Sequence, residues 1–475
     1  MIRVSVVFLL ALGALTALPA TARPVGPPLV IHAAKARDLD QIRASKVLRV
    51  LVNQSRNSSG EVQGQAIGVE YRRLAALESY LNRQPTSGKS AKIHLKLIPR
   101  SKEQLFGALQ RGEGDLVAPG ELMNNVPPQG VVASDALLGH TPLILVGRQG
   151  GRRYSHVEQL SGRTVALTSG SAAGAAIDAI NQKLIQRRLR PINVEWVDPT
   201  LAVEDVLEMV QGGIFGLTVV EQPIAERWGR VMPKLSLDRK VAFNTPQTMS
   251  WYVRNDAPAL RENIDQFIRG YKAPTDQDVA FKRVYGGLYQ VHYPLDRSDR
   301  QHLEQLRPLL QRNAREQHMD WLDLAAVAFK ESDLNPAAHG GNGATGLLQI
   351  TPSAARQVGV SDVHTVDSNV QAGARYLAMI RKKFFASNRL NERERMAFTL
   401  AAYNMGPERV EAMRAEAKRR GLNPNQWFFQ VERIAMEQMG MSAVSYVNSV
   451  NKYYLAFDRE RDTLEPGGRK VASLR

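Results

Sequence analysis

The chain has 475 residues, of which 44% are hydrophobic, and a formal net charge of +16. This length exceeds what one hydrophobic core usually serves, so we expect at least two domains. The hydrophobic fraction is ordinary for a soluble protein, and the absence of cysteine excludes a disulfide framework, a thiol nucleophile and a thiolate metal site.

The basic balance favours polyanionic partners: nucleic acid, acidic lipid head groups or an anionic cell wall. The nine histidines are scattered without the spacing of a zinc hydrolase. We therefore expect no metal and no cofactor.

Residues 1–22 have the pattern of a secretory signal peptide. Arg3 precedes an apolar run over residues 4–18, and small residues then lead to a predicted cleavage after Ala22. A transmembrane anchor is the alternative, but the run is short for crossing a bilayer and Pro19 follows it. An exported protein rarely reads nucleic acid, so we expect no nucleic-acid partner. Without a cysteine to carry a lipid, any membrane attachment must be peripheral.

Strand and helix patterns alternate through residues 40–275. This alternation predicts an α/β domain whose sheets are covered on their faces. We predict strands in 47–56, 91–100, 193–197 and 215–220, helices in 68–84, 101–116 and 201–213, and a strand, a glycine turn and a helix in 163–182.

Helical patterns alone follow from residue 300 to residue 458. We predict a connector over 276–299 and a mainly helical second domain over 300–458. The last residues, 459–475, form a polar tail that we expect to be disordered.

A carboxylate occupies an apolar position at the end of one predicted helix. Asp320 is a candidate N-cap, and Trp321, Leu324 and Ala328 then recur at helical spacing. The same face continues to Glu331, so the side chain is aimed along the apolar side. Desolvation there raises the pKa of a carboxyl group, which can then donate a proton near neutral pH. A solvated helix-end glutamate is the alternative.

A glycine-rich loop follows this helix. Four glycines between His339 and Gly346 leave backbone amides accessible and let a bulky ligand approach. Gln349 can then present an amide beside the helix. Tyr403 and Asn404 end another predicted helix before a Gly-Pro break, and such a pair can grip a sugar ring. A tyrosine at this position can equally fill the core.

Four stretches, AVAFKES, GATGLLQITPSAA, NVQAGARYL and AAYNMGPERV, together resemble the catalytic domain of soluble-type lytic transglycosylases. The resemblance covers roughly residues 300–455 and implies a helical, lysozyme-like fold. Residues 40–275 resemble the periplasmic solute-binding proteins of amino-acid uptake, an α/β clamshell. This order of domains is similar to that of membrane-bound lytic transglycosylases of type F.

The resemblance implies cleavage of the β-1,4 bond between N-acetylmuramic acid and N-acetylglucosamine in peptidoglycan glycan strands, with 1,6-anhydro ends and no water added. Glu331 matches the single catalytic acid and base of that family. The matching positions that hold the sugar are Ser332, Gln349, Tyr403, Asn404 and Tyr446.

The chemistry needs one carboxylate, whereas hydrolysing glycosidases use two. Asp333 is the nearest second candidate, but on a continuing helix it would point to another side. A lysozyme-type hydrolase of the same bond is therefore the first alternative. A transporter-type binding protein with an inactive helical domain and a structural wall anchor are the others.

We expect the first domain to bind something other than the free amino acid of an uptake carrier. Residues 121–139 contain no Arg or Lys to grip a ligand carboxylate, and a late acidic position is occupied by Glu221. The turn from Ser169 to Ser171 enters a helix and is a candidate anion site. We expect this domain to sense muropeptides, in a periplasmic protein held peripherally on the inner face of the outer membrane.

Overall fold

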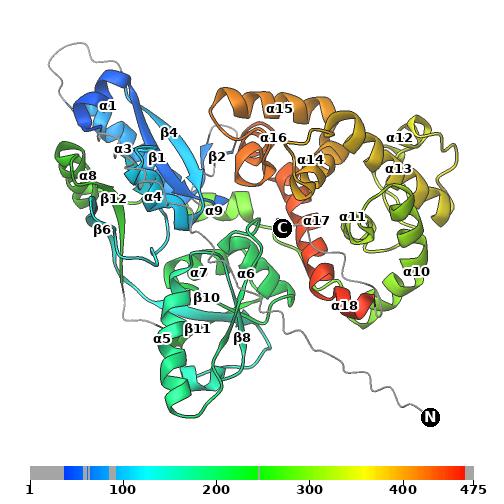
Figure 1. The fold of residues 1–475 in the computed structure, drawn as a ribbon, viewed down its shortest axis with the longest axis horizontal. Helices are drawn as coiled ribbons and strands as arrows, with labels where there is room; N and C mark the ends of the chain where they lie inside the picture. The colour runs from blue at the N-terminus through cyan, green and yellow to red at the C-terminus, as the bar shows by residue number, and fades with distance from the viewer. Residues whose placement is uncertain (1–36, 57–60, 63–64, 85–91, 244–246, 466–475) are drawn as a thin grey trace, which may run out of the picture.

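The computed structural model describes residues 37–56, 61–62, 65–84, 92–243 and 247–465. The predicted signal peptide, 1–22, lies outside the described residues. The described chain forms two α/β lobes and a helical domain that lies beside them (Figure 1). The predicted fold class, a clamshell followed by a mainly helical domain, is confirmed.

The first lobe is built on a five-stranded sheet in the order β4-β1-β5-β12-β6. Strand β1 is parallel to β4 and β5, and β12 is antiparallel to β5 and β6. Its elements are α1 (Leu39–Ser45), β1 (Val47–Asn53), the hairpin β2 (Glu61–Val62) and β3 (Gln65–Ala66), α3 (Val69–Arg83), β4 (His94–Arg100), η1 (Lys102–Gln104), α4 (Leu105–Gln110), β5 (Leu116–Ala118), β6 (Val131–Thr141), β12 (Gln247–Arg254) and α8 (Pro258–Gly270).

The second lobe has a five-stranded sheet in the order β11-β7-β10-β8-β9. The chain passes between the lobes twice, from β6 to β7 and from β11 back to β12. Its elements are β7 (Leu143–Arg148), η2 (Val157–Leu160), β8 (Thr164–Leu167), α5 (Ala172–Gln186), β9 (Asn193–Trp196), α6 (Val203–Gly212), β10 (Leu217–Glu221), α7 (Gln222–Gly229) and β11 (Leu235–Ala242).

The helical domain follows a short helix, α9 (Gln277–Tyr285), which lies within the predicted connector and packs its aromatic side chains against Trp228 of the second lobe. The domain contains α10 (Arg297–Glu316), α11 (Trp321–Ser332), η3 (Gly341–Gly343), α12 (Pro352–Gln357), α13 (Val366–Phe384), α14 (Glu392–Met405), α15 (Pro407–Arg419), η4 (Trp427–Val431), α16 (Glu432–Met439), α17 (Met441–Arg459) and α18 (Arg461–Leu464).

The expectation of a disordered tail from residue 459 is wrong for residues 459–465. Helix α17 runs to Arg459 and α18 follows it, with the side chain of Leu464 fully buried. One buried apolar side chain anchors this polar segment against the domain. Residues 466–475 lie outside the described residues.

One apolar core joins the second lobe to the helical domain. Buried side chains run continuously from α6 and α7 through α9 into α10, α11 and α17. This shared core fixes the helical domain against the clamshell. Among the described helices, none combines the length and apolar character needed to cross a bilayer.

Candidate active site

Helix α11 carries the carboxylate singled out by the sequence. Asp320 caps the helix by accepting a hydrogen bond from the Leu322 amide at 3.1 Å, as predicted. Residues 324–329 are all fully buried, so the helix is apolar around its whole circumference there. The sequence pattern predicted burial of one face of this helix only. Every side is buried, as is typical of a helix that is apolar all round and lies inside a core. Glu331 follows in the last turn of this central helix.

Glu331 is half-buried, and its carboxylate meets a hydroxyl from another helix. Tyr446 of α17 donates a hydrogen bond to Glu331 Oε1 over 2.6 Å. Burial raises the pKa of Glu331, and the Tyr446 hydrogen bond and Lys330 partly offset this rise. Burial also raises the pKa of Tyr446 well above its usual value, and the Glu331 charge adds to the rise. Tyr446 therefore stays a hydrogen-bond donor, and burial makes protonation of Glu331 easier than protonation of a solvated glutamate.

The chain turns sharply after α11. Asp333 and Leu334 have φ angles of 49° and 61°, and Asp333 ends the helix in the left-handed conformation. The Ser332 hydroxyl lies 2.9 Å from the Leu347 carbonyl oxygen and 3.0 Å from that of Ala328. Donation to Leu347 ties the end of α11 to the glycine-rich loop. The predicted contact of Ser332 with a sugar stays a prediction.

Asn369 of α13 holds the other side of the loop. Its side chain is buried, accepts from the Leu348 amide at 2.9 Å and donates to the Thr345 carbonyl at 2.8 Å. A Cβ atom on Gly346 would lie 2.4 Å from Asn369 Nδ2, and one on Gly373 would lie 2.3 Å from Leu348 Cδ1. Both glycines are therefore required by close packing against this loop.

Tyr403 of α14 fixes the same loop. Its hydroxyl donates to the Leu348 carbonyl over 2.7 Å, and its ring meets Tyr376 edge to face at 5.7 Å. Burial raises the pKa of Tyr403 well above its usual value, and the charge of Glu331 adds to the rise. The two tyrosine hydroxyls and the carboxylate thus belong to one site.

Gln349 and Asn404 complete the predicted set. The Gln349 amide donates to the Gly346 carbonyl at 2.8 Å and to the Ala338 carbonyl at 3.1 Å. Asn404 is exposed in the last turn of α14, next to Tyr403. Contacts with the loop thus bring Ser332, Gln349 and Tyr403 together. Glu331 precedes Ser332 and accepts from Tyr446, and Asn404 follows Tyr403.

No second carboxylate of the described residues acts on the pKa of Glu331. Among the described residues, Tyr446 and Lys330 are the groups that act on the pKa of Glu331 beside burial. Asp333 is exposed and lies beyond the end of α11. The arrangement therefore offers one proton donor and acceptor, whereas hydrolysing glycosidases use two carboxyl groups.

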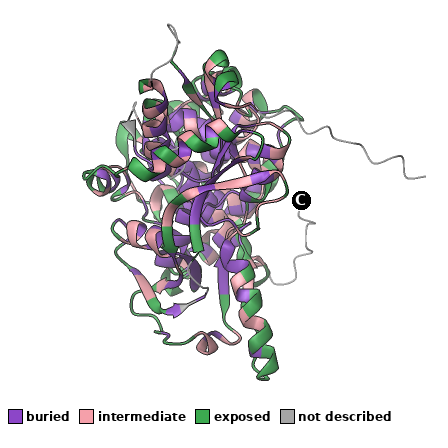
Figure 2. Cartoon of the chain, turned by 90° about the vertical axis from the view of Figure 1, so that its left-hand side faces the viewer, coloured by how far each residue is buried: buried purple, intermediate pink, exposed green. Residues whose placement is uncertain are grey.

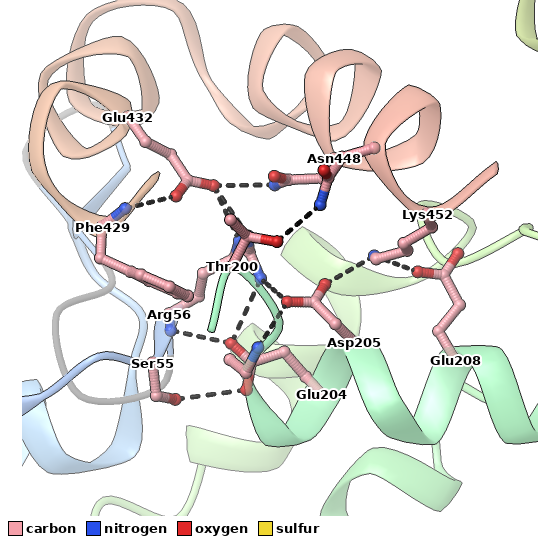
Figure 3. Close-up of polar contacts among 12 residues, drawn as sticks. Ser55, Arg56, Thr200, Glu204, Asp205, Glu208, Phe429, Glu432, Asn448 and Lys452 are labelled. Atoms are coloured by element: carbon pink, nitrogen blue, oxygen red, sulfur yellow. Dashed lines mark hydrogen bonds and ion pairs between the residues drawn. The ribbon is translucent and has the colours of Figure 1, made fainter. Parts of the chain in front are cut away.

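The opposite side of α17 faces the second lobe. Lys452 forms buried ion pairs with Asp205, at 2.6 Å, and with Glu208, both on α6 (Figure 3). Asn451 donates to the Thr200 hydroxyl at 2.9 Å. The helix that positions Tyr446 is thus held in the middle of the molecule, between α11 and α6.

Arg56 brings the first lobe into the same cluster. Its guanidinium group is buried and pairs with Asp205 at 2.7 Å and with Glu432 of α16 at 2.9 Å (Figure 3). Asn448 of α17 donates to Glu432 at 2.7 Å. Both lobes and the helical domain therefore meet at one charged, buried cluster. The sequence analysis missed it, although carboxylates within the apolar pattern of residues 201–213 were a usable signal.

The space between the lobes is bridged by side chains of the chain itself. Lys102 pairs with Glu121 at 3.0 Å, and Glu221 of the second lobe accepts from the Leu122 amide at 2.8 Å. All three charged side chains are buried. The chain's own lysine and carboxylates thus occupy the region where the sequence analysis found no arginine for a ligand carboxylate.

The predicted anion site at the start of α5 also has a partner within the chain. The Ser169 hydroxyl donates to the Glu103 carboxylate at 2.7 Å, and Ser171 caps α5 by accepting from the Ala173 amide. The carboxylate that approaches this turn therefore belongs to the first lobe, and binding of an external anion there stays a prediction.

Comparison with known proteins agrees with this arrangement. Residues 308–426 match the family of the transglycosylase SLT domain. The chain is similar to proteins named membrane-bound lytic murein transglycosylase F. The one from Desulfosudis oleivorans is 26% identical, covering 88% of this chain and 91% of its own length. The one from Alcanivorax borkumensis is also 26% identical, covering 90% and 91%.

Solved structures of amino-acid-binding proteins are similar to about half of the chain. An amino acid ABC transporter substrate-binding protein from Streptococcus pneumoniae, bound to L-arginine, covers 52% of this chain and 97% of its own, with 17% identity and a TM-score of 0.39. An ancestral arginine-binding protein covers 51% and 99%, with 16% identity and a TM-score of 0.39.

Proposed function

We propose that this chain is a peptidoglycan lytic transglycosylase in which Glu331 is first the acid and then the base. The SLT match and the full-length relatives support the transglycosylase activity. The observation that carries the role of Glu331 is its geometry: one half-buried carboxyl group with a raised pKa, hydrogen-bonded to Tyr446.

In the first step, protonated Glu331 gives its proton to the glycosidic oxygen between N-acetylmuramic acid and N-acetylglucosamine. The bond from the muramic C1 to that oxygen breaks, and the sugar ring gains oxocarbenium character. The Glu331 carboxylate then removes the proton from the muramic C6 hydroxyl, and O6 closes onto C1. The proton returns to Glu331, no water is consumed, and the product has a 1,6-anhydro end.

Tyr446 suits both steps. Its hydroxyl donates to the Glu331 carboxylate and so stabilises the charged form that appears after the first proton transfer. The loop held by Asn369 and Tyr403 would place Gln349, Asn404 and Ser332 along the sugar. This set of substrate contacts is the family's, carried to the matching positions here.

The test compares clearing of purified peptidoglycan by wild-type protein and by Glu331→Gln. This substitution keeps the shape of the side chain and removes the proton donor. We expect the rate to fall by about 10²- to 10⁴-fold, the usual contribution of general acid–base catalysis. Equal clearing by the two proteins would overturn the role of Glu331.

We further propose that the clamshell binds muropeptides. The clamshell architecture supports this proposal, because its two lobes meet at charged side chains, Lys102, Glu121 and Glu221, and not at an apolar surface. Calorimetry of the full chain carrying Glu331→Gln, titrated with muropeptides, tests this without cleavage of the ligand. Heat of binding is expected, and its absence with every wall fragment would count against the proposal.

We also propose that the protein works in the periplasm, held peripherally on the inner face of the outer membrane. The relatives are named membrane-bound. The signal pattern over residues 1–22 supports export. Fractionation of cells with and without high salt tests the location, since a peripheral protein is released from membranes by salt.

A further inference from the structure

Positive charge is concentrated in one segment of the second lobe. Residues 142–192 carry eight Lys and Arg against two Asp and Glu, a net charge of +6 out of the chain's +16. The segment runs from β7 through β8 and α5 to the start of β9. None of its basic residues belongs to the proposed active site. Such a concentration indicates an anionic partner of its own.

Three of these basic residues, Arg187, Arg188 and Arg190, directly follow the C-terminal end of helix α5. Its start lies against the first lobe, because a Cβ atom on Gly170 would be 3.1 Å from side-chain carbons of Lys102 and Glu103. Its 15 residues span about 22 Å. The C-terminal end of α5 therefore lies at the far end of the second lobe from the first (Figure 1). Exposed residues dominate this lower end of the molecule in Figure 2.

Apolar and basic side chains are both exposed at this end. Ile185 is 54% exposed and Leu189 40% exposed, and they are two of the few large apolar side chains exposed in the described chain. Arg188 lies between these two residues in the sequence, Arg190 follows Leu189, and both arginines are exposed. The guanidinium group of Arg190 packs against Gly162, because a Cβ atom on Gly162 would lie 3.0 Å from the Arg190 guanidinium carbon. Arg163, the next residue, therefore lies beside these side chains. We call Arg163, Ile185, Arg188, Leu189 and Arg190 the basic tip.

A cavity of about 310 Å³ adjoins the basic tip. Exposed Arg148 and Arg152 line it together with Arg163. Glu195 is the one carboxylate among its lining residues, and Arg459 binds it at 2.9 Å. Within the described part of the chain, none of the three other arginines has a carboxylate at ion-pair distance. The cavity therefore presents guanidinium groups that suit a phosphate group.

We propose that the basic tip and this cavity form the surface that docks on a bilayer containing anionic phospholipid, with a head-group phosphate held in the cavity. This inference deepens the proposed envelope location. Arginines near an anionic bilayer gain favourable electrostatic energy, and exposed aliphatic side chains gain from entering the head-group boundary. A hydrophilic glycan would offer Ile185 and Leu189 no such gain, which favours lipid over the cell wall as the partner.

The position of the surface fits a membrane-held enzyme that acts on the wall. Arg459, at the edge of the cavity, and Tyr446, at the active site, lie on the same helix α17. Thirteen residues of helix separate them, which is about 20 Å. Docking by the basic tip would therefore leave the glutamate free to meet a glycan strand.

Vesicle co-sedimentation of the exported chain, residues 23–475, tests the proposal without the apolar run of the signal segment. The vesicles contain phosphatidylethanolamine and phosphatidylglycerol, and phosphatidylcholine vesicles are the neutral comparison. The combined variant Arg163→Gln, Arg188→Gln and Arg190→Gln is expected to bind the anionic vesicles on the order of a hundredfold more weakly. Ile185→Ser with Leu189→Ser is expected to weaken binding even at high salt.

A matched control removes the same charge elsewhere: Arg83→Gln on α3, Arg283→Gln on α9 and Arg389→Gln between α13 and α14, all three of them exposed arginines. This control is expected to keep wild-type binding. Equal loss in both triple variants would show that only net charge matters and would overturn the surface. Equal binding to neutral vesicles would overturn the role of lipid charge.

Two further arms separate the sources of the anion. Inorganic phosphate that raises the melting temperature of the wild-type protein, with no binding to anionic vesicles, would overturn membrane docking in favour of a free-anion site. If the variant Arg163→Gln, Arg188→Gln and Arg190→Gln lost binding to purified sacculi and kept binding to vesicles, the surface would be assigned to the wall and membrane docking would be overturned. Because Glu331→Gln is expected to bind vesicles normally, failure of docking and failure of the proposed catalysis are distinguishable.

Discussion

Tyr446→Phe isolates the hydrogen bond on which the proposed acid depends. The substitution removes the hydroxyl that donates to Glu331 Oε1 over 2.6 Å and keeps the aromatic ring. Burial raises the pKa of Glu331, while this hydrogen bond opposes the rise. Cleavage needs the protonated form first, so activity is present below the pKa of Glu331 and is lost as the pH rises through it. Without the hydroxyl that pKa is higher still, and the alkaline limb of the rate profile must move to higher pH.

The size of the movement follows from the energy of the bond. A hydrogen bond to a charged group contributes about 1.5–3 kcal/mol. Since one pH unit corresponds to about 1.4 kcal/mol, the limb is expected to move up by about one to two pH units.

The assay is kcat/KM for release of soluble fragments from purified peptidoglycan, measured across pH. Tyr403→Phe is the matched control, because its hydroxyl donates to the Leu348 carbonyl and not to Glu331. It is expected to lower the rate while leaving the limb in place. An alkaline limb that stays fixed or moves to lower pH in Tyr446→Phe would refute the reasoning.

Three further predictions concern packing and stability. Gly373→Ala would push on Leu348, 2.3 Å from the added Cβ, and is expected to cost about 1–3 kcal/mol in unfolding free energy and to slow cleavage; unchanged values of both would contradict the packing of the loop. Arg56→Met leaves Glu432 without its ion-pair partner in the buried cluster, and the free energy of unfolding, measured by denaturant titration, is expected to fall by about 3–5 kcal/mol. A fall of less than about 1 kcal/mol would contradict a stabilising role of the cluster. Burial raises the pKa of Glu394 from 4.5 to about 7, so its favourable contribution to stability is lost as the pH rises through this range. Glu394→Gln is therefore expected to stabilise the protein at pH 8, by up to about 3 kcal/mol, and not at pH 4; equal effects at both pH values would contradict this.

The sequence patterns that predicted elements correctly are local ones. Strand β8, the glycine turn and α5 follow one another as predicted for residues 163–182, although α5 continues to Gln186; apolar periodicity and turn residues were enough here. Strands β6 and β12 were not predicted. They pair with each other across more than a hundred residues, and the buried residues of β6 do not alternate strictly. A pattern confined to one segment carries no information about such a partner.

The same distinction holds for the site. Asp320 as cap and Glu331 at the end of an apolar helix could be read within one segment. The hydrogen bond from Tyr446 joins residues 115 positions apart, and the family resemblance, not periodicity, pointed to that tyrosine. Arg56 meets Glu432 across 376 positions and was not anticipated at all. Long-range polar contacts of this kind depend on the whole fold.

Mass spectrometry of the fragments released from purified peptidoglycan tests the central claim most directly. Transglycosylase action by Glu331 is expected to give muramic ends that are one water lighter than the hydrolysed form with the wild-type protein, and none with Glu331→Gln. Reducing muramic ends that carry the oxygen of labelled water would contradict it, since a second group would then have to activate that water.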